Sequence, residues 1–386
     1  MTSFAAYQNE IYLQGLADNK PPFTTNPDEL EASARERLGP GPFWYVAGSA
    51  GTGATARANR EAFDRWRIVP RMLTDATTRH LGTSLLGTEL PAPVLLAPIG
   101  VQSILHPEGE LATARAAAEL GVPFILSTAS SHTIEDVAEA AGDAARWFQL
   151  YWPNDPDVCA SILDRARQAG FTVLVVTLDT WTLAWRPHDL DQSYLPFLRG
   201  VGTAIPFSDP AFRAGLAAPP EEDLPMAILR WVQLFTGTDR GWDQLAFLRE
   251  HWDGPIVLKG IQHPDDARKA VDAGVSGIVV SNHGGRQVDG AVASLDVLPE
   301  IAEAVGEQVE VLFDSGVRSG ADVVKALALG AKAVLLGRPF AYGLAHGGEV
   351  GVRHVLRGLL ADFDLTLGLS GHRSPAELNR EVLRRR

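Results

Sequence analysis

Two side chains with complementary chemistry follow one apolar run in the second half of the chain. Residues 277–280 (GIVV) are followed by SNHGGRQ at residues 281–287. An apolar run of this kind is typical of a buried parallel strand. His283 can accept a proton near neutral pH, and the planar guanidinium of Arg286 suits a carboxylate. A base beside a carboxylate-binding group is what chemistry at the carbon next to an acid group requires.

Gly284 and Gly285 separate these two side chains. Glycine adopts backbone conformations that other residues avoid, so the pair predicts a sharp turn that brings the backbone close to a ligand. The alternative is a loop in which His283 and Arg286 only hydrogen-bond carbonyl groups. The elements around the motif favour the first interpretation.

From residue 93 onward, apolar runs alternate with helical patterns. We expect eight strands, at Pro93–Gly100, Pro123–Ser127, Arg146–Tyr151, Val173–Asp179, Pro255–Gly260, Gly277–Ser281, Val309–Ser315 and Ala333–Gly337. Helices are expected between them at Glu108–Leu120, Pro156–Ala169, Asp265–Ala273 and Ala321–Leu329, each followed by a glycine that is typical of a helix end. Eight strands alternating with helices predict an α/β fold of the closed (β/α)8 TIM barrel type.

Two stretches fall outside this alternation. Residues 1–92 form a predicted N-terminal extension with a helix at Asp28–Leu38, and GSAGTG at residues 48–53 predicts a turn because its spacing matches no nucleotide-binding loop. A long segment rich in Pro, Asp and Phe follows the fourth strand. We expect residues 187–240 to form a lid over the mouth of the barrel, with an inert insertion as the alternative. The whole chain, 1–386, is predicted to be one barrel domain.

Polar residues stand at the ends of six predicted strands. They are Gln149 and Tyr151, Thr177 and Asp179, Lys259, His283 and Arg286, Asp314 and Arg318, and Gly337 and Arg338. The carboxyl ends of barrel strands meet at one mouth, and the loops after the last two strands often hold a phosphate. These side chains are therefore expected to converge on one site.

Composition narrows the class of partner. The chain has 386 residues, 46% of them hydrophobic, which is enough for a large core. Its formal charge of −13 argues against nucleic acid and against an anionic membrane surface, although local arginines can still bind a small anion. The single cysteine, Cys159, excludes an intrachain disulfide and suits a reducing cytoplasm. Since the N-terminal residues lack the apolar run of a signal peptide, we expect a soluble cytoplasmic protein.

The motifs resemble those of one known family. SNHGGRQ, together with LKG at residues 258–260 and DSGVRSG at residues 314–320, resembles the FMN-dependent α-hydroxy-acid oxidases and dehydrogenases. The resemblance covers almost the whole chain, with YVAG at 45–48, HPEGE at 106–110 and WFQLY at 147–151. Within the family the chain looks most like the lactate 2-monooxygenase branch, through APIG at 97–100, LDTW at 178–181, WRP at 185–187 and the long predicted lid.

This resemblance implies bound FMN, no metal, and a role for each candidate residue. His283 would be the base, with Asp179 behind it and Tyr151 bonded to the hydroxyl group that is oxidised. Arg186, Arg286 and Tyr45 would hold the substrate carboxylate. Lys259 would stabilise the negative charge that reduction places on the flavin. The remaining cofactor-binding residues would be Pro98, Gly100, Ser127, Gln149, Thr177, Ser281, Asp314, Arg318, Gly337 and Arg338.

The implied reaction is oxidation of a small (S)-2-hydroxy acid, with L-lactate and O2 giving acetate, CO2 and water as the first choice. One alternative is an oxidase that releases the 2-keto acid and hydrogen peroxide. Others are a dehydrogenase that passes electrons to a quinone or carrier protein, and a flavin-binding scaffold without catalysis. The family also implies a homotetramer or homo-octamer.

Two departures from the family pattern concern the substrate side chain. Ala129 stands where plant-type relatives carry a large aromatic residue, which implies a roomier pocket on that side. Leu183 and Ala184 replace the Phe-Gly of the monooxygenase pattern near the expected position of the lactate methyl group.

Overall fold

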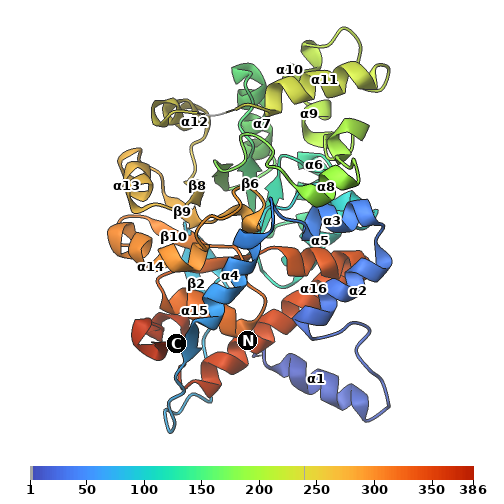
Figure 1. The fold of residues 1–386 in the computed structure, drawn as a ribbon. Coiled ribbons are helices and arrows are strands. Elements are labelled where there is room, and N and C mark those ends of the chain that lie inside the picture. The colour runs from blue at the N-terminus through green and yellow to red at the C-terminus, as the bar shows by residue number, and fades with distance from the viewer. Residues whose placement is uncertain (1–2, 239) are drawn as a thin grey trace.

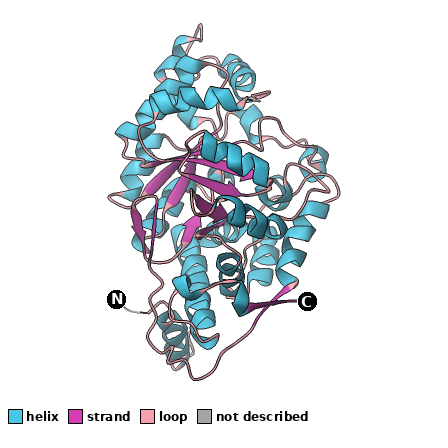
Figure 2. Cartoon of the chain, turned by 90° about the vertical axis from the view of Figure 1, so that its left-hand side faces the viewer, coloured by secondary structure: helices cyan, strands magenta, loops and turns pink. Residues whose placement is uncertain are grey.

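The computed structural model describes residues 3–238 and 240–386, and its centre is a closed barrel of parallel strands surrounded by helices (Figures 1 and 2). The strands are β4 (Val94–Leu96), β5 (Phe124–Ser127), β6 (Arg146–Leu150), β7 (Val173–Thr177), β8 (Ile256–Ile261), β9 (Gly277–Val280), β10 (Glu310–Phe313) and β11 (Ala333–Leu336). Each pairs with the next along the chain, and β11 pairs with β4 to close the ring. The predicted (β/α)8 barrel is confirmed.

The barrel strands are buried on both faces. Every residue of β7 is buried, and the same holds for β5, β9 and β11. One face of each strand fills the barrel, where Leu95, Ile125, Trp147, Val175 and Leu312 pack together, and the other face meets the surrounding helices. Burial on both faces explains why these strands are continuous apolar runs in the sequence.

The helices outside the barrel agree with the sequence pattern. They are α5 (Gly109–Glu119), α6 (Ile134–Ala141), α7 (Pro156–Gln168), α12 (Leu245–His251), α13 (Pro264–Asp272), α14 (Ser294–Val305), α15 (Gly320–Ala328) and α16 (Arg338–Leu369). The four predicted helices are present within one or two residues of the expected bounds, and the glycine after each has a positive φ. Among the described residues, no helix combines the length and apolar character needed to cross a bilayer.

A hairpin from the N-terminal extension closes the end of the barrel where the strands begin. Strands β2 (Thr83–Leu85) and β3 (Thr88–Leu90) pair antiparallel, and Leu85 and Leu90 pack among the side chains that fill the barrel. A second short pair joins β1 (Trp66–Ile68) to β12 (Leu383–Arg385). The sequence pattern predicted neither pair, because strands of three residues are too short to show an alternation.

The rest of the extension is helical and leads to the mouth of the barrel. It contains α1 (Ala6–Gly15), α2 (Pro27–Arg37), α3 (Pro40–Ala47) and α4 (Ala54–Asp64). Helix α2 confirms the predicted helix, and residues 48–53 form the predicted turn before α4. The carboxylate of Asp289 accepts hydrogen bonds from the Thr52 hydroxyl (2.8 Å) and from the backbone N–H groups of Thr52 (2.6 Å) and Ala54 (2.7 Å). These bonds, the one from the Thr52 hydroxyl most of all, lower the pKa of Asp289 to about 2. This carboxylate joins the extension to the loop after β9.

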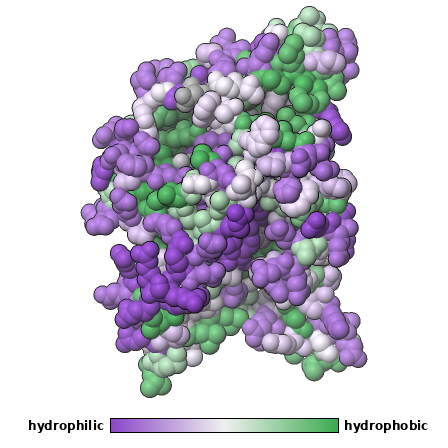
Figure 3. All heavy atoms as spheres, in the orientation of Figure 1, coloured by the Kyte–Doolittle hydropathy of each residue, from purple (hydrophilic) through white to green (hydrophobic). Residues whose placement is uncertain are grey.

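The predicted lid segment, residues 187–240, is a series of short helices. They are α8 (Pro187–Asp191), η2 (Pro196–Arg199), α9 (Ala204–Ser208), α10 (Pro210–Ala214) and α11 (Leu224–Phe235), with η3 (Trp242–Gln244) leading into α12. Each of α8, η2, α10 and α11 begins with proline at its first or second position, where a missing N–H is tolerated. The outer side of α11 leaves Leu224, Met226 and Leu229 exposed, and hydrophobic atoms gather on the upper part of the molecule in Figure 3.

The hairpin plug gives a prediction about stability. Leu85 is fully buried in the barrel interior, so Leu85→Ala should lower the free energy of unfolding by about 2–5 kcal/mol through lost burial and the cavity left behind. Leu16→Ala is the control, because Leu16 is exposed and its substitution should change that free energy by less than about 0.5 kcal/mol. Urea titration measures both. Equal effects of the two variants would show that the hairpin adds nothing to barrel stability.

Candidate active site

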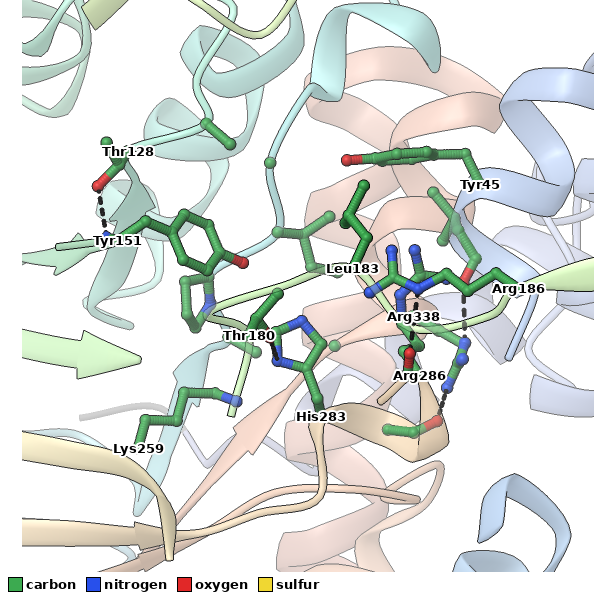
Figure 4. A pocket seen from close by; sticks show the side chains of 18 of the residues that line it. Tyr45, Thr128, Tyr151, Thr180, Leu183, Arg186, Lys259, His283, Arg286 and Arg338 are labelled. Carbon is green, nitrogen blue, oxygen red and sulfur yellow. Dashed lines mark hydrogen bonds between the residues drawn. The ribbon is translucent and has the colours of Figure 1, made fainter. Parts of the chain in front are cut away.

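A cavity of about 300 Å³ lies at the end of the barrel where the strands finish. Figure 4 shows Tyr151, His283, Arg186 and Leu183 directed into the same space from different elements. The predicted substrate and catalytic residues that line the cavity are Tyr45, Tyr151, Arg186, His283 and Arg286. The predicted cofactor residues that line it are Pro98, Gly100, Lys259, Asp314, Arg318, Gly337 and Arg338. Residues separated by almost 300 positions in the chain therefore share one space.

The other predicted site residues lie behind the cavity wall. Ser127, Gln149, Thr177 and Ser281 are buried and do not line the cavity, and Asp179 lies behind His283. Ser281 and Gln149 are each bonded to a residue that lines the cavity. The hydroxyl of Ser281 accepts a hydrogen bond from Lys259 Nζ (3.0 Å), and the backbone carbonyl of Gln149 accepts one from the Thr128 hydroxyl (2.6 Å). Thr177 lines a smaller neighbouring cavity together with Tyr151 and Thr180.

His283 and Asp179 form a buried pair. His283 Nδ1 lies 2.8 Å from Asp179 Oδ1, and the Thr180 hydroxyl lies 3.0 Å from the same nitrogen and donates to the same carboxylate oxygen (2.9 Å). Burial lowers the pKa of His283 below its usual value, against the opposing effect of Asp179. Burial alone would raise the pKa of Asp179, but the charges of His283 and Lys259 lower it to about 2. At neutral pH the arrangement therefore favours a neutral imidazole and a carboxylate.

The turn that carries His283 has an unusual backbone. His283, Gly284 and Gly285 all have positive φ, at 57°, 65° and 76°. A Cβ on Gly285 would lie 2.5 Å from the backbone nitrogen of Ala56 in α4. The sharp turn predicted for the two glycines is therefore present, and the lack of a side chain at Gly285 allows the N-terminal extension to pack closely against it. Gly284 does line the cavity.

A pair of asparagines fixes this turn from the side of the extension. Asn59 and Asn282 exchange two amide hydrogen bonds, of 2.8 and 2.7 Å, and both side chains are buried. Asn282 Oδ1 also accepts a hydrogen bond from the backbone of Gly285 (3.0 Å). Helix α4 therefore sets the position from which His283 enters the cavity.

Two guanidinium groups face the cavity near His283. Arg186 Nε donates to the carbonyl of Arg286 (3.0 Å), and Arg286 donates to the carbonyl of Gly48 (3.0 Å). Burial, together with the charge of Arg286, lowers the pKa of Arg186 to about 10. Two adjacent cations in a buried place are stabilised by an anion between them, and the planar fork of each suits a carboxylate.

Two tyrosines complete this side of the site. Burial raises the pKa of Tyr45, and burial with the nearby charge of Asp179 raises the pKa of Tyr151 to about 12. Both hydroxyls therefore stay protonated at neutral pH and can donate hydrogen bonds. The backbone of Tyr151 is held by the hydroxyl of Thr128 (3.0 Å), and Arg286 lies over the ring of Tyr45 at 5.5 Å.

The residues on the opposite side of the cavity fit the flavin ring of FMN. Lys259 is buried, with Nζ 3.1 Å from Asp314 Oδ2. Burial alone would lower the pKa of Lys259, but the charges of Asp314 and Asp179 raise it, so the side chain is a cation. Gln149 Oε1 accepts a hydrogen bond from Ser127 (2.7 Å), while its Nε2 is buried without a partner among the described residues. An unpaired buried amide is costly, and the carbonyl and nitrogen acceptors of a flavin edge would satisfy it.

Arg318 and Arg338 offer positive charge for a phosphate. Burial, with the charges of Arg286 and Arg318, lowers the pKa of Arg338 to about 10, and burial lowers the pKa of Arg318 as well. Arg338 also has a structural task, because it donates to the carbonyls of Val46 (2.9 Å), Gly48 (2.8 Å) and Gly284 (3.0 Å). The negative charge of a bound phosphate would offset the positive charges of the Arg318 and Arg338 guanidinium groups.

Several residues of the site had no role in the sequence analysis. Gln287 donates to the carbonyls of Asp179 (2.7 Å) and Thr182 (3.0 Å) and accepts from Arg186 (2.6 Å), so it ties the ends of β7 and β9 together. Ser315 accepts from the backbone of Gly284 (3.0 Å) and donates to Asp314 (2.8 Å). Both stand inside the recognised motifs and could have been assigned from them. Asn59 lies outside every motif, so its role could not be predicted from the sequence.

Comparison with known proteins identifies the family of the chain. Residues 34–385 match the family model described as FMN-dependent dehydrogenase. The chain belongs to that family. It is 52% identical to the FMN-dependent alpha-hydroxy acid dehydrogenase qulF of Penicillium citrinum, over 99% of this chain and 96% of that protein. It is 44% identical to an L-lactate oxidase of Lysinibacillus sphaericus, over 89% of this chain and 88% of that protein.

The same relationship holds in three dimensions. A crystal structure of mandelate oxidase superposes with a TM-score of 0.83 and 39% identity, covering 94% of this chain and 99% of that one. The protein is therefore an FMN-dependent oxidoreductase of α-hydroxy acids.

The buried His283–Asp179 pair predicts a pH dependence. If neutral His283 is the base, kcat/KM should be lost as the pH falls below the lowered pKa of His283, that is, on the acid side of about 6.5. Asp179 raises that pKa, so Asp179→Asn should move the acid limb to still lower pH as well as reduce the rate. Steady-state rates between pH 4 and 9 measure the limb, at about half-unit steps. An acid limb that stays in place in Asp179→Asn would mean that another group titrates.

The two phosphate candidates predict different outcomes on substitution. Arg318→Ala should raise the dissociation constant of FMN about tenfold or more, since a hydrogen bond to a charged group is lost. Arg338→Ala should weaken FMN binding and also lower the thermal unfolding temperature of the apoprotein, because three bonds to backbone carbonyls are lost. Fluorescence of released flavin and thermal scans measure the two effects. Unchanged FMN affinity in both variants would exclude a phosphate at this position.

Proposed function

We propose that the protein oxidises an (S)-2-hydroxy acid to the 2-keto acid and passes the two electrons to O2, which is released as hydrogen peroxide. The observation that carries this proposal is the convergence of the His283–Asp179 pair with the guanidinium groups of Arg186 and Arg286 in one cavity. A base beside a carboxylate clamp is suited to oxidation at the carbon next to a carboxylate. The likeness to an L-lactate oxidase and to mandelate oxidase supports O2 as the acceptor.

The contact between His283 and Asp179 supports His283 as the base. Nδ1 of His283 bonds the Asp179 carboxylate, so the proton resides on Nδ1 and the lone pair on Nε2 is free to accept a proton from the substrate. Asp179 then stabilises the imidazolium that forms, as a carboxylate does in other His-based sites. FMN bound beside Lys259 supplies the acceptor for the two electrons. The cation of Lys259 offsets negative charge at that place.

The remaining residues orient the substrate. Arg186 and Arg286 bind the carboxylate, helped by the hydroxyl of Tyr45. The hydroxyl of Tyr151, whose pKa of about 12 keeps it protonated, donates to the substrate oxygen that becomes the keto group. Holding both ends of the acid in this way would fix the reacting carbon beside the base, and such orientation is a large part of catalysis.

The lactate 2-monooxygenase expected from the sequence stays a prediction. That chemistry needs the keto acid and peroxide to remain together until they react, and the relatives described above are named as oxidases or as a dehydrogenase. The dehydrogenase name of the qulF relative makes a second candidate, in which a quinone or carrier protein replaces O2. Assembly into a tetramer or octamer and a cytoplasmic location stay predictions as well.

Product analysis tests the proposal. Turnover of (S)-2-hydroxy acids under air should give 2-keto acid and hydrogen peroxide in equal amounts. The variant His283→Gln should keep FMN but lose about 10²–10⁴-fold in anaerobic flavin reduction, because general-base catalysis is lost.

Each other result has a definite meaning. Acetate and CO2 from lactate without free peroxide would identify a monooxygenase. Flavin that the acid reduces, and that a quinone but not air reoxidises, would identify a dehydrogenase. Flavin that no 2-hydroxy acid reduces would overturn the function itself.

A further inference from the structure

One wall of the cavity is formed by mainly apolar side chains of the predicted lid segment. Its lining residues from that segment are Leu195, Phe197, Leu198, Trp231, Val232, Phe235 and Thr236. Among the described residues of the segment that line the cavity, none is charged. This wall offers nothing to a second carboxylate or an ammonium group on the substrate, and it offers a large surface to an apolar one.

Aromatic rings make up the centre of this wall. Phe197 and Trp231 stack with ring centroids 4.6 Å apart and planes inclined by 21°, and Trp231 and Phe235 stack at 5.7 Å and 22°. Phe197 also meets the ring of Tyr45 edge-on at 6.4 Å. A row of aromatic rings therefore runs from Tyr45, in the proposed carboxylate clamp, to helix α11 of the predicted lid segment.

Helix α11 is fixed in the orientation that turns these rings inward. Trp231 and Phe235 stand four residues apart and so share one face of the helix. On the other side, Arg230 donates to Asp155 (3.1 Å) and to the carbonyl of Phe212 (3.1 Å). The carbonyl of Leu234 accepts from the backbone of Asn154 in the loop after β6 (2.8 Å). These contacts tie the wall to the barrel.

The space beside this wall is kept open by small residues. Ala129 lines the cavity and packs with Val101 and Phe197. Gly100 also lines the cavity, and a Cβ at that position would lie 2.7 Å from the Cβ of Ala129, so a larger residue at position 100 would clash with Ala129. The large apolar residues on this side of the cavity therefore come from the predicted lid segment and not from the loop after β5.

We propose that the substrate is a 2-hydroxy acid with an aromatic side chain, whose ring packs against the Phe197–Trp231–Phe235 stack. This inference rests on the proposed function and adds the substrate class to it. An aromatic side chain extends the row of rings at the spacing that aromatic groups prefer, and it buries apolar surface that a methyl or hydroxymethyl group leaves uncovered. Trp231, in the middle of the stack, is the specificity-determining residue.

Rates on a set of acids test this proposal with the FMN-loaded protein. The parent enzyme should show kcat/KM for (S)-mandelate or (S)-3-phenyllactate at least about tenfold above that for (S)-lactate. Trp231→Ala should lower the value for the aromatic acids at least about tenfold and change that for lactate less than about twofold. Trp231→Phe, which keeps a ring, should stay close to the parent.

Leu229→Ala is the matched control, because Leu229 lies on the same helix, is exposed and does not line the cavity. Its rates on both classes of acid should equal those of the parent. A second readout is independent of turnover: benzoylformate should perturb the flavin absorbance of the parent at lower concentration than pyruvate does, and Trp231→Ala should remove this difference. FMN content shows that each variant is folded.

The outcomes separate the two proposals. Flavin reduction by lactate that depends on His283, with no preference for aromatic acids, would overturn the substrate class and leave the proposed function standing. An equal loss on aromatic acids and lactate in Trp231→Ala would also overturn it, since the residue would then only support the fold. Absence of reduction by any 2-hydroxy acid would overturn the proposed function instead.

Discussion

The mouth of the barrel concentrates positive charge, and much of the surrounding structure serves to hold it. Lys259, Arg186, Arg286, Arg318 and Arg338 all line one cavity, in a chain with a formal charge of −13. Buried like charges repel and lose their hydration, which is why the pKa values of Arg186 and Arg338 fall to about 10. Backbone carbonyls and the carboxylate of Asp314 offset part of this cost. The positive charge that remains favours binding of anions. The proposed cofactor carries a phosphate, and the proposed substrate carries a carboxylate.

The N-terminal extension is part of the site although it contributes no barrel strand. Its carbonyls at Val46 and Gly48 accept hydrogen bonds from Arg338 and Arg286, and Asn59 fixes the turn that carries His283. Asp289 in return caps the start of α4. A positive φ costs energy at His283, which is not a glycine, so the turn depends on its surroundings to hold it. The extension supplies those surroundings, so loss of its packing would disturb the base and the clamp together.

The predicted lid segment supplies the apolar wall of the cavity, whereas the polar groups of the site come mainly from elsewhere in the chain. The base proposed at His283 and the cation at Lys259 stand at the ends of barrel strands, held by the closed sheet and by α4. The side-chain wall stands on helices of the predicted lid segment, which are attached by polar contacts such as that of Arg230 with Asp155 and by buried residues such as Phe212. In such an arrangement, substitutions in the wall can alter which acid is bound, while the proposed base and carboxylate clamp stay the same.

The sequence by itself determined the barrel, the cofactor family and the set of residues at the strand ends. Strands buried on both faces appear as continuous apolar runs, and parallel strands of a closed barrel must all end at one mouth. Only the tertiary structure showed that Gly285 packs against α4 and that Asn59 pairs with Asn282. It also revealed the hairpin plug, whose three-residue strands carry no periodicity. Phe197 and Trp231 stack on each other although more than thirty residues of Pro-rich chain separate them in the sequence. Such contacts cannot be predicted from a local sequence pattern, because they depend on how separate elements pack together. The barrel strands can be predicted, because the burial of each strand on both faces requires an apolar run in its own sequence.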